Sequence, residues 1–92
     1  KLKELTVNPG ESLSMQRHFH RNEFWFVAQG VATLHSCTDT KHFVEHEYIF
    51  INKEEWHQLC NKHESPLKVI EIQYGDKCIE EDIERKQILS ST

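Results

Sequence analysis

The sequence predicts an all-β fold, and three observations lead to this class. Short apolar or alternating runs recur at intervals of about 8 to 12 residues, which is the spacing of strands in a sandwich or barrel. Residues that favour turns separate these runs. Several runs alternate polar and apolar residues, as strands with one buried face do. The pattern therefore predicts about eight antiparallel strands.

Each expected strand ends at residues with a physical reason to break it. In Asn8-Pro9-Gly10, proline restricts φ and glycine tolerates positive φ, so a turn is expected. Gln29-Gly30 separates two strongly β-prone runs and suggests a tight hairpin. Pro66 opens the last long run, where a missing amide donor is tolerated. The expected strands are residues 2–7, 13–18, 23–28, 31–36, 41–44, 48–51, 56–60 and 67–74.

The C-terminal stretch has a different character. Residues 79–89 (IEEDIERKQIL) place acidic residues first and Arg85-Lys86 later, the charge order that stabilises a helix dipole. The sequence predicts a single domain over residues 1–92, with a barrel over about residues 2–75. A tail over about residues 76–92 is expected to form a short helix or a loose arm.

Composition excludes several classes of partner and location. The net charge is −4 and the basic residues do not cluster, which argues against nucleic acid and anionic membranes as partners. No apolar run approaches the roughly 20 residues of a membrane span, and the first residues are too polar for a signal peptide. Cys37, Cys60 and Cys78 form no C-x-x-C pair, as expected of free thiols in a reducing compartment. We therefore expect a cytoplasmic protein.

Histidines provide the candidate chemistry. Alternate residues of a strand share a face, so Gln16, His18 and His20 are expected to point to one side. Glu23 begins the next run and could return its carboxylate to these rings, while His57 lies far along the chain. Two or three histidines with one carboxylate suit a divalent transition-metal ion with open coordination positions.

These residues lie in a recognisable pattern. H-x-H, a glutamate and a later histidine resemble the two motifs of the cupin superfamily, whose members hold one metal inside a small jelly-roll β-barrel. Residues 9–25 (PGESLSMQRHFHRNEFW) resemble more closely the opening of the cupin domain of type II phosphomannose isomerases, in which PGxSLSxQxHxHRxExW recurs. Residues 70–75 (IEIQYG) and 80–85 (EEDIER) resemble that family's closing segments IExQxG and EDDIxR.

The chain departs from the family pattern at the second motif. Residues 50–61 (FINKEEWHQLCN) keep the histidine and asparagine of YIPxGxxHxxxN but lack its proline and glycine. Many family members also carry a nucleotidylyltransferase domain. The present sequence contains neither G-x-G-x-x-G nor a P-loop, so no nucleotide chemistry is expected of it.

The resemblance implies a function and a set of site residues. The expected activity is metal-dependent aldose–ketose isomerisation of mannose 6-phosphate or a similar sugar phosphate or polyol, through an enediolate. The implied metal ligands are His18, His20, Glu23 and His57, with zinc as the expected ion and manganese, iron, cobalt or nickel as alternatives. Glu23 and Arg85 are the implied catalytic residues, and Gln16 and Arg85 the implied substrate-binding residues.

The resemblance also implies a homodimer. Phe24, Trp25 and Phe26 are consecutive, so both faces of their strand are apolar. A strand covered on both faces lies in a closed core or against a partner sheet, and cupins commonly associate through such sheets.

The other four histidines, which lack partner spacing, are interpreted as surface residues: His35, His42, His46 and His63.

Other interpretations remain open from the residues alone. The histidines could line a metal-free polar cavity, and Glu23 could pair with a nearby arginine. Gln16 could simply hydrogen-bond a neighbouring strand, and Arg85 could be a solvated charge opposite Glu81 at helical spacing. The chain could accordingly be a non-catalytic cupin that binds a metal or small ligand. It could also be a metal-dependent dioxygenase, since similar ligand sets hold iron.

Overall fold

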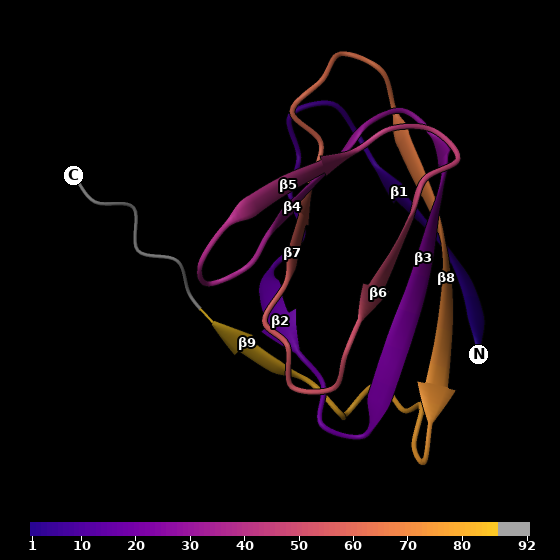
Figure 1. The fold of residues 1–92 in the computed structure, drawn as a ribbon, viewed down its shortest axis with the longest axis vertical. Coiled ribbons are helices and arrows are strands. Elements are labelled where there is room, and N and C mark those ends of the chain that lie inside the picture. Colours follow the sequence, from indigo (N-terminus) through magenta and orange to yellow (C-terminus); the bar gives the residue numbers. More distant parts are fainter. Residues whose placement is uncertain (87–92) are drawn as a thin grey trace.

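The computed structural model describes residues 1–86 and confirms the all-β class (Figure 1). The strands occur close to the expected positions, and every pair of named strands runs antiparallel. Within the described part of the chain no helix is long and apolar enough to cross a bilayer. The strands are β1 (Leu2–Val7), β2 (Met15–Arg17), β3 (Arg21–Gln29), β4 (Ala32–His35), β5 (Thr40–Phe43), β6 (Tyr48–Ile51), β7 (Gln58–Cys60), β8 (Leu67–Gly75) and β9 (Glu84–Lys86).

Two sheets enclose the interior, and a third strand pair lies at one end. The larger sheet has the order β1-β8-β3-β6 and the smaller one β5-β4-β7. In Figure 1 these sheets lie on opposite sides of the molecule, with the pair β2-β9 at the lower end. Neighbours such as β1 and β8 are distant in sequence. The fold therefore brings residues from both ends of the chain to one interior.

The interior is apolar at one end and polar at the other. Buried residues alternate with half-buried or exposed ones along β3 and β8, so one face of each strand points inward. Across the pair, Val27 lies opposite Val69, whereas Glu23 lies opposite Gln73. The buried apolar cluster comprises Val7, Trp25, Val27, Ala32, Ile49, Ile51, Leu59, Leu67 and Val69. The polar end is therefore closed off by a packed hydrophobic core.

Of the two forms expected for the segment after β8, the arm is the one that occurs, and the short helix is absent through Lys86. A turn at residues 80–81 leads into β9, which pairs with β2 so that Arg85 lies opposite Gln16. The Asp82 carboxylate accepts hydrogen bonds from the backbone amides of Phe19 and His20. These long-range bonds and the pairing with β2 outweigh the local charge order that favoured a helix. Residues 87–92 of the predicted tail lie outside the described residues.

The outer face of the larger sheet is unusually apolar. Tyr48 and Phe50 on β6 are 60% and 58% exposed, and Tyr74 on β8 is also exposed. Phe24 on β3 packs between the strands, with its ring centroid 5.1 Å from that of Phe50. The expectation that β3 is apolar on both faces is thus confirmed, because Trp25 is buried inside while Phe24 lies outside.

Candidate metal centre

Two histidines and one carboxylate converge at the polar end of the barrel. His18 directly follows β2, Glu23 lies on β3, and His57 immediately precedes β7 and bridges to Gln16. One potential ligand atom from each residue lies within 4.8 Å of the other two, and all three residues are buried. His18 Nε2 is 3.3 Å from Glu23 Oε2, and His57 Nε2 is 3.9 Å from Glu23 Oε1. Ligands far apart in sequence therefore surround one point.

Hydrogen bonds fix the orientation of both rings. His18 Nδ1 lies 2.6 Å from the carbonyl oxygen of Asp82, and His57 Nδ1 lies 2.9 Å from that of Glu55. A carbonyl oxygen can only accept, so each Nδ1 carries the proton and donates it. The Nε2 lone pairs then point toward Glu23. This is the arrangement in which histidine binds a metal through one nitrogen while the other is held by a backbone carbonyl.

Burial keeps both imidazoles neutral. Removal from water lowers the pKa of His57 to about 4. The same desolvation lowers the pKa of His18, despite the opposing hydrogen bond from its ring to the Asp82 carbonyl. A neutral ring is needed for ligation because the lone pair must be free. The two rings are therefore available to a cation near neutral pH.

Glu23 is held by two neighbours on its own strand. Trp25 Nε1 donates to Glu23 Oε1 over 2.9 Å, and Arg21 Nε donates to Glu23 Oε2 over 2.9 Å. Trp25 Nε1 also lies 3.1 Å from Glu71 Oε2 on the adjacent strand β8. Burial and the neighbouring Glu23 carboxylate raise the pKa of Glu71. Gln73 Nε2 donates to the other oxygen of Glu71, which completes a buried polar network.

Several residues around the cluster, among them Glu71, Arg21 and Asp82, were not among the predicted site residues. Glu71 could have been found from the alternation of residues 67–73, which places an acidic side chain on the buried face. Arg21 follows the H-x-H motif directly, but no local pattern shows that it turns inward. Asp82 acts through hydrogen bonds to Phe19 and His20, which lie more than 60 positions away in sequence.

The structure places His20 outside this cluster. Strand β2 ends at Arg17 and the chain bends at Phe19 and His20, so the alternation that would align Gln16, His18 and His20 is interrupted. The side chain of His20 is 45% exposed, and its Nδ1 lies 3.5 Å from Asp76 Oδ2. The Asp82 carboxylate holds the bend through the two backbone amides at its centre. A ligand role for His20 would require this bend to open.

The two predicted substrate-binding residues line the same cavity as the ligands. This cavity has a volume of about 180 Å³, and His18, Glu23 and His57 form part of its wall. Gln16 and Arg85, opposite each other in the β2–β9 pair, also line it. The arm thus brings Arg85 to the wall of the cavity that holds the ligand set. The remaining lining residues are Lys3, Leu5, Leu13, Arg21, Trp25, Leu59, Glu71, Glu80 and Ile83.

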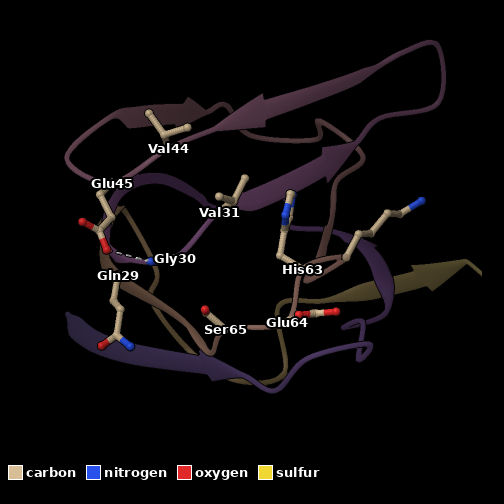
Figure 2. Close-up of a pocket in the computed structure, with 9 residues that line it drawn as sticks. Gln29, Gly30, Val31, Val44, Glu45, His63, Glu64 and Ser65 are labelled. Carbon is tan, nitrogen blue, oxygen red and sulfur yellow. Dashed lines mark hydrogen bonds between the residues drawn. The ribbon is translucent and has the colours of Figure 1, made fainter.

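A larger hollow of about 870 Å³ lies near the opposite end of β3 (Figure 2). Its walls come from the connections β3–β4, β5–β6 and β7–β8, and most of the lining side chains are exposed. Figure 2 shows Glu45 bonded to the backbone of Gly30, while His63 and Glu64 lie along another wall. None of the three clustered ligands lines this hollow. His42, His46 and His63 are exposed and His35 is half-buried, in keeping with their interpretation as surface residues.

Comparison with known proteins identifies related sequences. The family described as mannose-6-phosphate isomerase C-terminal matches residues 1–87. The alginate biosynthesis protein AlgA of Pseudomonas aeruginosa is 41% identical over 85 residues, which are 91% of this chain and 18% of that protein. The mannose-1-phosphate guanylyltransferase of Escherichia coli K12 is 40% identical over 84 residues, with the same coverage of both chains. The chain thus spans less than a fifth of these relatives.

Solved structures share the fold at low sequence identity. A Klebsiella pneumoniae protein with a double-stranded β-helix domain has a TM-score of 0.82 and 15% identity, covering 95% of this chain and 74% of that one. A Cupin 2 conserved barrel domain protein from Salinispora arenicola has a TM-score of 0.75 and 21% identity, covering 82% and 62%. These likenesses establish a cupin-type barrel.

Replacement of individual histidines should separate the buried ligands from the exposed ring. We expect His18→Ala and His57→Ala each to abolish stoichiometric Zn²⁺ binding, because each removes one of three converging ligand atoms. His20→Ala should retain binding, with His63→Ala as a distant control. Isothermal titration and metal analysis of purified protein would measure this. Loss of binding in His20→Ala with retention in His18→Ala would show that another cluster holds the ion.

The lowered pKa of His57 predicts acid sensitivity of the metal-free protein. The unfolded chain binds a proton at a pKa near 6.5 and the folded protein only at about 4, so stability falls as the pH drops through that window. The difference corresponds to roughly 3 kcal/mol for this ring. Urea unfolding measured between about pH 7 and 4.5 should show this loss of unfolding free energy. In His57→Asn the unfolding free energy should fall less steeply with decreasing pH. An equal dependence of the unfolding free energy on pH in both proteins would contradict a buried neutral His57.

Proposed function

Because the chain belongs to the mannose-6-phosphate isomerase C-terminal family, which has the cupin fold, we propose that it is a metal-dependent sugar-phosphate isomerase. The proposed reaction interconverts mannose 6-phosphate and fructose 6-phosphate. One observation carries this proposal: three buried ligand atoms converge in a cavity that Arg85 also lines. A set of two imidazoles and one carboxylate suits zinc and the neighbouring divalent ions.

The metal centre would provide the electrophile of an aldose–ketose isomerisation. An ion held by His18, Glu23 and His57 supplies a Lewis acid that polarises the carbonyl and adjacent hydroxyl oxygens of the substrate. The cavity of about 180 Å³ is below the roughly 300–1,000 Å³ of pockets for drug-sized ligands. It suits the reacting end of a sugar, with the rest of the substrate at the mouth.

Proton transfer requires a base close to the reacting carbons. Glu23 is one candidate, but a carboxylate that binds a metal tightly is not free to accept a proton. Glu71 is a second carboxyl group in the cavity wall, and it lies outside the ligand set. We assign the ligand role to Glu23 and infer that Glu71 is the carboxyl group able to exchange a proton with substrate.

Arg85 would stabilise negative charge on the substrate. Its place opposite Gln16 sets Arg85 at the cavity wall, from which its guanidinium could bind a phosphate or the developing charge on the substrate oxygens. The structure provides no helical turn that would pair it with Glu81, because Glu84–Lys86 is a strand. Gln16 would bind a substrate hydroxyl beside it.

Activity of the Arg85 variant tests this assignment. In a coupled assay that detects fructose 6-phosphate, Arg85→Ala should lower kcat/KM by at least about tenfold, equivalent to roughly 1.4 kcal/mol of transition-state stabilisation. Metal content should not change. Lys86→Ala is the matched control, since it removes the adjacent positive charge without altering the cavity wall. Wild-type activity in Arg85→Ala would contradict its role.

Three measurements on the wild-type chain separate the alternatives: sugar-phosphate turnover, metal binding and oxygen consumption. Turnover that requires added metal supports the isomerase. Stoichiometric metal binding without turnover of any sugar phosphate would instead indicate a non-catalytic binding domain, and oxygen consumption with ferrous ion would indicate a dioxygenase.

We also infer that the apolar outer face of the larger sheet contacts a second copy of the chain. Tyr48, Phe50 and Tyr74 are exposed there, over an apolar layer that includes Phe24. A contiguous exposed apolar face is typical of an interaction surface. Sedimentation at micromolar concentration should give a dimer, and the pair of changes Tyr48→Glu and Phe50→Glu should give a folded monomer. A monomeric wild-type chain would contradict self-association through this face.

A further inference from the structure

A buried guanidinium group lies inside the ligand set. Arg21 begins β3, is only 8% exposed, and points toward the barrel interior. Its Nε donates to Glu23 Oε2 over 2.9 Å, and its Nη2 lies 3.2 Å from His18 Nε2. Its Nη1 donates to the Ile79 carbonyl of the arm over 3.4 Å. All three nitrogens of the guanidinium therefore have acceptors.

Two of these acceptors belong to His18 and Glu23, which are candidate metal ligands. His18 Nε2 carries a lone pair, because Nδ1 of that ring donates to a carbonyl oxygen. It faces a carboxylate oxygen of Glu23 at 3.3 Å, so two acceptors lie side by side in a buried site. Such a pair is unfavourable without a donor or cation between or beside them. Arg21 supplies both the hydrogen bonds and the positive charge.

We propose that Arg21 is an internal counter-ion, which occupies the cation position of the metal-free site and leaves His18 and Glu23 when a divalent ion binds. This inference rests on the metal centre of the proposed function. Both cations require the single lone pair of His18 Nε2, and both draw on the carboxylate of Glu23. Their positive charges also repel at such short range, so the two cannot hold these atoms together.

If Arg21 competes with the metal ion, removing it should change the metal affinity in the opposite direction from removing a residue that supports the ligands. If Arg21 only supported the ligands, its removal would misplace them and weaken metal binding. If it competes for them, its removal destabilises the metal-free state and strengthens metal binding. The sign of the change in affinity therefore separates the two roles.

Zinc affinity of charge variants tests the proposal. With Zn²⁺ alone as the probe and a chromophoric chelator as competitor, Arg21→Gln should bind at least about tenfold more tightly than the wild-type chain. Arg21→Lys keeps the charge but loses the planar fork, and it should lie between the two. Arg85→Gln removes a positive charge from the same cavity without touching a ligand atom, and it should change the affinity less than about threefold.

Each outcome is informative. Zinc binding by the wild-type chain that Arg21→Gln leaves unchanged or weakens would overturn the counter-ion role alone and leave the metal centre intact. An equal increase in Arg85→Gln would attribute the effect to general repulsion and would also overturn it. Failure of every variant to bind zinc would overturn the inference together with the proposed metal-dependent function.

The wild-type chain provides an independent test if Arg21→Gln does not fold. The protein has three arginines, so the guanidinium Nε–H signal of Arg21 can be assigned in an NMR spectrum. The buried hydrogen bond to Glu23 predicts slow exchange of this proton with water in metal-free protein. Stoichiometric Zn²⁺ should abolish that protection. Protection that persists in the zinc-saturated protein would show that Arg21 stays bound to Glu23.

Discussion

The structure depends on the burial of one carboxylate. Glu23 is 1% exposed and lies on the inward face of the central strand β3. An unpaired charge in such a place would cost several kcal/mol of desolvation. Trp25 and Arg21 compensate this cost on the same strand, while His18 and His57 supply two further polar groups around it. The polar end of the barrel is thus organised to satisfy Glu23, and the apolar core at the other end provides the stability that allows it.

The arm links this interior to the C-terminal part of the chain. Asp82 contributes its backbone carbonyl to the His18 ring and its carboxylate to the amides of Phe19 and His20. One residue therefore orients a candidate ligand and holds the bend that turns the next histidine outward. The β2–β9 pairing places Arg85 at the cavity, and Ile79 accepts a hydrogen bond from Arg21. Substitutions in the arm should therefore alter the positions of the candidate metal ligands through these contacts.

Local patterns predicted the strands well, because alternation and turn residues act over a few positions. The central strand was expected at residues 23–28 and occurs at Arg21–Gln29, and His18, Glu23 and His57 were all predicted to come together. The sequence pattern failed where long-range contacts decide. His20 was assigned the face of His18 by strand alternation, but the bend held by Asp82 ends the strand first. The charge order left a short helix or an arm open for the tail, and pairing with β2 decides for an arm in which residues 84–86 form a strand. Alternation along residues 67–73 does place Glu71 on the buried face, but no local pattern shows that Arg21 turns inward, because its place depends on the register of β3 against β8.

The central claim is that His18, Glu23 and His57 together hold one divalent ion. Anomalous diffraction at the zinc absorption edge, from crystals grown with stoichiometric Zn²⁺, tests it most directly. The account predicts one strong peak, at about 2.0–2.2 Å from His18 Nε2, His57 Nε2 and a Glu23 oxygen. A peak beside His20 and Asp76, with none at the buried cluster, would contradict it.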